Sequence, residues 1–157
     1  MPRQMWTLTQ ADTSFLIDHT IKAARGMGVT VRVVIVERGG NTVGLLRMDD
    51  AKLASIGVAT GKAWTAALFQ RASADYAAPA APGGNSYGVL NTYPGKLVPL
   101  PGGQPIFVEG TCIGGIGISG ASGEQDDRLA EAAVAALMKM SREGGTTQGS
   151  AFAAQQR

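Results

Sequence analysis

Cysteine and histidine are almost absent from this sequence, and their scarcity excludes several kinds of site. Of 157 residues, one is cysteine and one is histidine. The single cysteine, Cys112, excludes a disulfide within the chain, and its place in an apolar stretch predicts a buried, unreactive thiol. The single histidine, His19, excludes a metal site built on two histidines of one chain. We therefore expect no metal site, and for His19 either a surface or packing role or a place in a site shared with another chain.

Strong charge and long apolar runs are also missing. The formal net charge is +2, and there is no cluster of lysine and arginine of the kind that binds nucleic acid. No apolar run approaches the ~20 residues that span a membrane, and the first residues are followed by no apolar segment typical of a signal peptide. We therefore expect neither a nucleic-acid partner nor a membrane partner, and a cytoplasmic location.

What is present is a succession of helical and strand-like periodicities. A helix that Thr9 caps is expected to end at Gly26 and Gly28, and two β-branched runs then flank a glycine-containing turn. The strands are expected at residues 29–36, 42–48, 104–109 and 111–119, with a short edge strand at 96–100. Further helices are expected at 51–69, capped by Asp49 or Asp50, and after a capping box at Ser122. Strands joined by hairpins predict a mostly antiparallel sheet with helices on at least one face, an α+β domain.

The last predicted strand is unusually rich in glycine. Gly114, Gly115 and Gly117 lie inside it, and Gly102 and Gly103 precede its hairpin partner. Glycine within a strand usually marks a bend, a bulge or the close approach of another backbone or a ligand. The stretch 101–127 then turns into an acid-rich helix start. It predicts either one wall of a small-molecule site or a tight contact between a helix and the sheet.

The helix predicted at 51–69 has two lines of residues. The expected core line is formed by Leu53, Ile56, Ala63 and Ala67. The second line is small and is formed by Gly57, Gly61 and Thr65. Small side chains let another backbone come close, from a neighbouring helix or subunit, or admit a ligand. Lys62 lies among these small residues, and it points either outward to solvent or inward as a partly desolvated amine.

Residues 77–105 hold six of the seven prolines of the chain, together with Tyr87 and Tyr93. A stretch of this length without regular structure is usually functional or disordered. Prolines that restrict it and tyrosines that anchor it favour an ordered loop. The tyrosines either bind a flat aromatic ligand beside the glycine-rich strand or pin the loop to the body of the domain.

Several short motifs occur together in a recognisable order and spacing. They are Val36-Glu37-Arg38-Gly39-Gly40, Arg47-Met48-Asp49, Ala54-Ser55, Gly61-Lys62-Ala63-Trp64-Thr65-Ala66, Gly102-Gly103-Gln104-Pro105, Gly114-Gly115-Ile116-Gly117-Ile118-Ser119-Gly120 and Glu124-Gln125-Asp126. Over residues 7–140, this set closely resembles the GlcG/HbpS-like family of haem-degrading or haem-binding proteins. The C-terminal domain of some PduO-type cobalamin adenosyltransferases is similar as well.

The resemblance implies a profilin-like α+β fold, with an antiparallel sheet of about five strands flanked by helices, and homo-oligomers from dimers to octamers. Some members of the family bind haem, and others belong to small-molecule catabolic pathways, including aromatic degradation. This chain departs from the family pattern at Glu37, where an aspartate is usual, and it has no export signal like that of the secreted haem-binding branch. For haem it offers His19, a tyrosine or a methionine as an axial ligand. These departures favour a cytoplasmic catabolic role.

The resulting hypothesis is a lyase- or hydrolase-like enzyme acting on a small aromatic or carboxylated metabolite, for example a hydroxylamino-aromatic acid. Lys62 is expected to pair with the negative charge of the substrate, and Glu124 or Asp126 to act as general acid or base. The expected substrate-binding residues are Arg47, Thr65, Tyr87, Tyr93, Gly102, Gly103, Ser119 and Gly120. The amides near the three glycines among them would bind an oxyanion or a carboxylate. This enzyme requires no cofactor; the alternative is a non-catalytic protein that binds haem or another tetrapyrrole.

The domain organisation expected from composition is simple. Residues 1–143 form one domain. Residues 144–157 are dominated by Gly, Thr, Gln and Ala, which predicts a flexible tail or an arm that reaches a neighbouring subunit.

Overall fold

The computed structural model describes residues 1 and 5–144. The tail predicted from residue 144 onward lies, apart from Gly144, outside these residues. In chain order the elements are α1 (Gln10–Gly26), β1 (Arg32–Glu37), β2 (Thr42–Arg47), α2 (Ser55–Phe69), a 3-10 turn (Ser73–Tyr76), α3 (Ala77–Ala80), α4 (Val89–Thr92), β3 (Gly103–Val108), β4 (Thr111–Ser119) and α5 (Gly123–Glu143).

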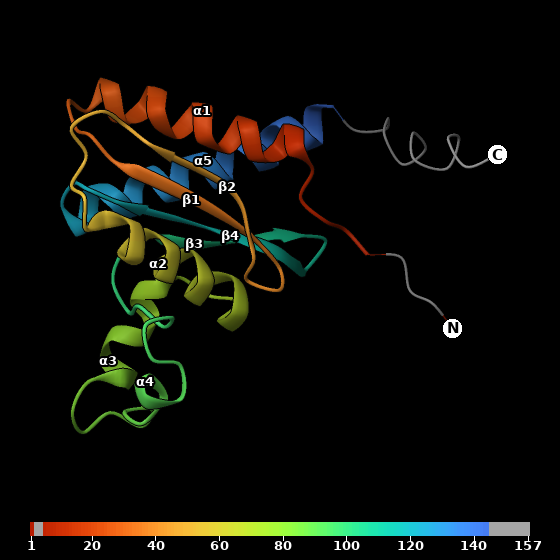
Figure 1. Ribbon diagram of the computed structural model, residues 1–157. Coiled ribbons are helices and arrows are strands. Elements are labelled where there is room, and N and C mark those ends of the chain that lie inside the picture. Colours follow the sequence, from red (N-terminus) through yellow and green to blue (C-terminus); the bar gives the residue numbers. More distant parts are fainter. Residues whose placement is uncertain (2–4, 145–157) are drawn as a thin grey trace.

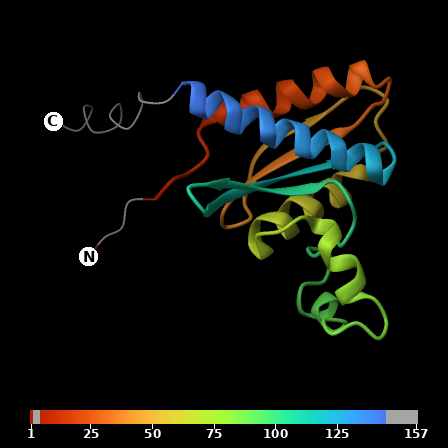
Figure 2. The same ribbon diagram turned by 180° about the vertical axis from the view of Figure 1, so that it is seen from behind.

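An antiparallel sheet forms the middle layer of the domain (Figure 1). Within the described residues it has four strands in the order β2-β1-β4-β3, so β1 and β4 are central. Helices α1 and α5 lie on one face and α2 on the other; Figure 2 shows α5 and α1 in front of the sheet. This is the antiparallel α+β architecture that the sequence predicts.

Two of the long helices begin as the sequence predicts. Thr9 and Asp12 form a capping box at α1, and Ser122 and Gln125 form one at α5. The prediction for α2 is wrong: it begins at Ser55, and neither predicted aspartate caps it. The reason is a turn before the helix, in which Ala51 N–H donates to Met48 O and Asp50 adopts a φ of 63°.

The sheet separates a large apolar core from a small one. The large core joins α1 and α5 to the sheet and includes Leu16, Val33, Ile35, Ile106, Ile116, Ile118, Leu129 and Leu137. The small core under α2 consists of Val34, Val36, Ala59, Ala63 and Ala67. The core positions predicted at Leu53 and Ile56 are wrong, because their side chains are 77% and 41% exposed. Alanine and glycine form the buried side of α2 instead, which brings its backbone close to the sheet.

Glycines in β4 make this close approach possible. A Cβ atom at Gly115 would lie 2.6 Å from Ala63 O, and one at Gly117 would collide with Ala59 O. The space that the glycines leave is therefore filled by the backbone of α2. The interpretation as a tight contact between a helix and the sheet is confirmed, and the alternative of an open ligand wall at these glycines is wrong.

The segment between α2 and β3 projects beyond α2, where it carries α3 and α4 (Figure 1). The edge strand predicted at 96–100 does not form. Val98 N–H donates to Thr65 Oγ1 at 2.9 Å, so this part of the segment is bound to α2. The sheet consequently has four strands where about five were expected.

Cys112 lies in β4 and is buried, as the sequence predicts. Its thiol contacts Ala67 O and Gly114 O at 3.6 and 3.4 Å. Burial raises the pKa of the Cys112 thiol, which keeps the sulfur protonated at neutral pH.

The packing of α2 predicts opposite effects for two glycine substitutions. Gly117→Ala should lower the free energy of unfolding by about 1–3 kcal/mol or more, because the new methyl group meets the backbone of α2. Gly57→Ala is the matched control, since a Cβ there meets nothing within 4 Å. We expect it to be neutral or to stabilise by up to about 1 kcal/mol through helix propensity. Urea unfolding of both variants measures this; equal stabilities would contradict the packing argument.

Candidate functional site

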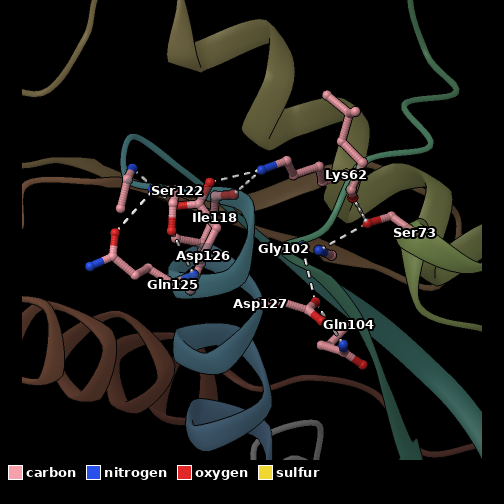
Figure 3. Close-up of polar contacts among 12 residues, drawn as sticks. Lys62, Ser73, Gly102, Gln104, Ile118, Ser122, Gln125, Asp126 and Asp127 are labelled. Carbon is pink, nitrogen blue, oxygen red and sulfur yellow. Dashed lines mark hydrogen bonds and ion pairs between the residues drawn. The ribbon is translucent and has the colours of Figure 1, made fainter. Parts of the chain in front are cut away.

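Lys62 points into the protein from the middle of α2, toward the start of α5 (Figure 3). Its Nζ donates to Ile118 O at 2.8 Å and lies 3.0 Å from Asp126 Oδ2. The side chains of Lys62 and Asp126 are only 3% and 4% exposed. The interpretation of Lys62 as an outward, solvated lysine is therefore wrong, and two of the three predicted catalytic residues are brought together.

The local sequence explains how Asp126 meets this lysine. Asp126 lies in the first turn of α5, which is set in place by the capping box at Ser122. A carboxylate is stabilised at this end of a helix by the dipole, and Asp126 Oδ1 also accepts from Ala121 N–H at 3.1 Å. A Cβ at Gly102 would lie 2.9 Å from Lys62 Nζ, so only glycine leaves room for the ammonium group there.

The backbone amides of Gly102 and Gly103 have partners within the protein. Gly102 N–H donates to Asp127 Oδ1 and Gly103 N–H to Ser73 Oγ, both at 3.0 Å. Gln104 Nε2 donates to the same Asp127 oxygen at 3.0 Å. The prediction that these two amides bind an oxyanion of a substrate is therefore wrong. Asp127 and Ser73 were missed, although the pair of aspartates at the helix start was a signal for the first.

Glu124 is separated from this buried cluster. Its side chain is exposed and accepts from Arg128, one turn further along α5. The arrangement therefore supplies one buried ion pair, Lys62–Asp126, that connects α2, β4 and α5. The two charges neutralise each other in the protein interior, where burying either charge alone would cost free energy of desolvation.

The other predicted binding residues divide between the loop and the end of the sheet. Thr65 is buried and accepts from Val98 N–H. Tyr93 packs its ring 5.2 Å from that of Trp64 and 5.9 Å from that of Phe69. Thr65 and Tyr93 thus pin the loop to α2, which is one of the two roles expected for the tyrosines. Tyr87 is 55% exposed.

Arg47, Ser119 and Gly120 lie at one end of the sheet, beside the start of α2. Gly120 has a φ of 149°, and a Cβ there would lie 2.5 Å from Thr30 O. Arg47 is exposed, and Ser119 is nearly buried. Between them, in register with both, lies Arg32. Arg32 was not predicted as a site residue, although an arginine inside an apolar strand was a visible signal.

An open cleft of about 430 Å³ lies between the start of α1 and β2. Its lining is mixed: Leu8, Ile17, Val43 and Leu45 are apolar, and Thr9, Gln10, Thr13 and Ser14 are polar. This cleft was not predicted from the sequence. It forms because Gly44 lets α1 approach: a Cβ at Gly44 would collide with Thr13 Cγ2.

Residues 1 and 5–144 contain neither a cluster of metal ligands nor a membrane-spanning helix. No group of three or more His, Cys, Asp or Glu side chains in this part of the chain is arranged to hold a metal ion. None of the helices described there is long and apolar enough to cross a membrane.

The sheet order and its two helical faces define a profilin-like α+β domain with a buried lysine–aspartate pair. The chain belongs to the family described as Haem degrading protein HbpS-like, whose model matches residues 8–135. This confirms the family resemblance seen in the sequence motifs.

Individual relatives support the same assignment. An uncharacterised 15.0 kDa protein of Citrobacter freundii, from the dhaT-dhaS intergenic region, is 33% identical over 84% of this chain and 93% of its own length. The corrinoid adenosyltransferase PduO of Citrobacter freundii is 38% identical over 74% of this chain, which spans only 35% of that relative. A crystal structure of a PduOC–haem complex has a TM-score of 0.80 at 37% identity, covering 83% of this chain and 95% of its own.

The buried ion pair predicts a large stability effect. Lys62→Met should lower the free energy of unfolding by about 3–5 kcal/mol, because it leaves the Asp126 carboxylate buried without its counter-charge. Adding Asp126→Leu to Lys62→Met should recover much of that loss, since no buried charge then remains. Chemical unfolding of the two single variants and the double variant measures the coupling.

A matched control uses the exposed pair on α5. Glu124→Gln removes a carboxylate that is paired at the surface, and we expect a change below about 1 kcal/mol. A Lys62→Met variant as stable as Glu124→Gln would show that the buried pair contributes nothing to holding α2 against α5.

Proposed function

We propose that this protein binds a small molecule, and that the ligand is haem or a related flat tetrapyrrole. The observation that carries the proposal is the likeness, at 37% identity, to the solved PduOC–haem complex. The description of the matching family, Haem degrading protein HbpS-like, supports it as well. These findings favour the tetrapyrrole alternative over the lyase- or hydrolase-like enzyme.

The described residues include side chains of the chemical types that bind haem iron. Haem iron takes an imidazole, thioether, thiolate or phenolate as its axial ligand. His19 is half-buried on α1, with its ring 5.9 Å from that of Phe15. Tyr87 is largely exposed in the projecting segment, and its hydroxyl makes no hydrogen bond within the described residues. The cleft beside β2 has a mixed lining, in which Leu8 and Ile17 offer apolar contact to a macrocycle.

A haemin titration followed by visible spectroscopy tests the proposal. We expect a saturable, one-to-one shift of the Soret band. His19→Ala or Tyr87→Phe should weaken the complex and change its spectrum, whichever of the two supplies the axial ligand.

Tyr93→Phe is the matched control. It keeps the ring that packs on Trp64 and removes only a hydroxyl, so the spectrum of the complex should match that of the original protein. A flat or unsaturable response of the original protein would remove the tetrapyrrole proposal. A normal complex in both the His19 and Tyr87 variants would move the ligand to Tyr76 or a methionine.

A second candidate function is the enzyme acting on a small aromatic or carboxylated metabolite. One observation favours it: a lysine and an aspartate buried together, since ionisable groups held in this way occur at catalytic sites as well as in structural pairs. Incubation with small aromatic acids and their hydroxylamino derivatives tests it. Absence of product from all of them would leave Lys62 and Asp126 with a structural role alone.

Two expectations from the sequence analysis accompany the proposed function. We propose that the protein assembles as a homo-oligomer, between a dimer and an octamer, and that it acts in the cytoplasm. Sedimentation over a concentration series measures the first, and a persistent monomer would contradict it.

A further inference from the structure

Arg32 is a buried cation whose charge no acidic group of residues 1 and 5–144 offsets. Only 7% of it is exposed, and its Nε is buried with no hydrogen-bond partner in the part of the chain that the structure describes. Its Nη1 makes one long contact, 3.5 Å from Leu53 O. Within the described residues, no carboxylate lies within 4.0 Å of this guanidinium. A buried charge in this condition is costly unless something outside the chain compensates it.

A second arginine lies directly opposite the first. In the antiparallel pairing, Arg32 is in register with Arg47 on β2 and with Ser119 on β4. Residues in register share a face of the sheet. That face is the one toward α2, because Val34, two residues after Arg32, packs on Ala59. Like charges directly opposite each other are destabilising. An anion bound between Arg32 and Arg47 would reduce this repulsion.

The start of α2 adds further donors at the same place. The contact between Arg32 Nη1 and Leu53 O puts the guanidinium at this helix end. The first N–H groups of a helix have no partner within the helix, and the dipole there attracts negative charge. In α2 the N-cap is Ala54, which offers no side-chain acceptor, and the first turn holds no acidic residue. A Cβ at Gly57 would meet nothing within 4 Å, so there is open space beside these amides.

We propose that the end of the sheet beside α2 is a binding site for the carboxylate of a small organic molecule. Arg32 and Arg47 bind the carboxylate oxygens, and the amides of Ile56 and Gly57 and the hydroxyl of Ser119 complete the set of donors. Arginine presents a planar pair of N–H groups that matches a carboxylate. The buried Lys62 ammonium lies outside this site, because Asp126 already neutralises it.

The surroundings favour an organic carboxylate over inorganic phosphate. Leu45 lies two residues before Arg47 on the same face of β2, and Ile56 lies in the first turn of α2. Both side chains are exposed. They offer apolar contact to the rest of a ligand whose carboxylate is held by the arginines. The proposal does not depend on haem binding.

Calorimetric titration of the full chain with sodium benzoate tests the site, with sodium phosphate and sodium chloride as separate arms at equal ionic strength. We expect saturable binding of benzoate and none of chloride. Arg47→Gln should weaken benzoate at least about tenfold, the loss of one charge-assisted hydrogen-bonded pair. Arg25→Gln, which removes one exposed positive charge from the end of α1, is the matched control and should bind benzoate normally.

Arg32→Met separates binding from a structural role. If the arginine serves the ligand, this variant loses benzoate binding while its melting temperature without anions stays equal or rises, because an uncompensated buried charge is gone. Equal weakening of benzoate by Arg47→Gln and Arg25→Gln would overturn the proposal as general charge attraction. Saturable phosphate binding without benzoate binding would overturn the carboxylate class.

One further outcome would assign the arginine a different partner. Failure to bind any anion, together with lower stability or a smaller oligomer for Arg32→Met, would identify an acidic group of a second copy as the counter-charge. That result also overturns the proposal. It would leave the haemin titration unaffected, so the two functional proposals fail or succeed separately.

Discussion

The close approach of α2 to β4 is the constraint on which the rest of this domain depends. Gly115 and Gly117 have no side chains to hold the helix away, so its backbone lies against the strand. Alanines complete the contact from the helix side. The contact sets the depth at which every residue of α2 lies, which is why Lys62 ends inside the protein and Ile56 outside. It also removes the volume in which a ligand would have been expected beside the glycine-rich strand.

Polar groups at the C-terminal end of β4 also connect α2 to the sheet and to α5. Lys62 crosses from α2 to the Ile118 carbonyl and to Asp126, while Asp127 holds the Gly102 amide (Figure 3). Each charge and each of these amides is satisfied within the protein. A site closed in this way suits a structural connector between layers, because a ligand would have to displace well-formed contacts in order to bind.

The second buried cation is Arg32. It is in register with Ser119, the residue that follows Ile118 on β4. Arg32 is buried like Lys62 but meets no acid among the described residues, and Arg47 lies opposite it. Lys62 is neutralised by Asp126. The proposed anion site therefore lies beside Arg32, at the start of α2, and not at the family motif around Lys62. A cleft of mixed polar and apolar lining beside β2 is a second open surface. The proposed tetrapyrrole binding and the proposed carboxylate binding at Arg32 both concern surfaces other than the tight contact between α2 and β4.

The sequence by itself determined the order of the elements, the hairpins and the capping boxes at Thr9 and Ser122, because these follow from local periodicity and from contacts a few residues apart. It also determined the family, since several motifs occur together. Only the tertiary structure decided which way Lys62 points, that Ser73 and Asp127 accept from the glycine amides, and that Arg32 lacks a counter-charge among the described residues. Each of these depends on partners from distant segments, whose distances and burial are set when the layers pack together and not by neighbours in the chain.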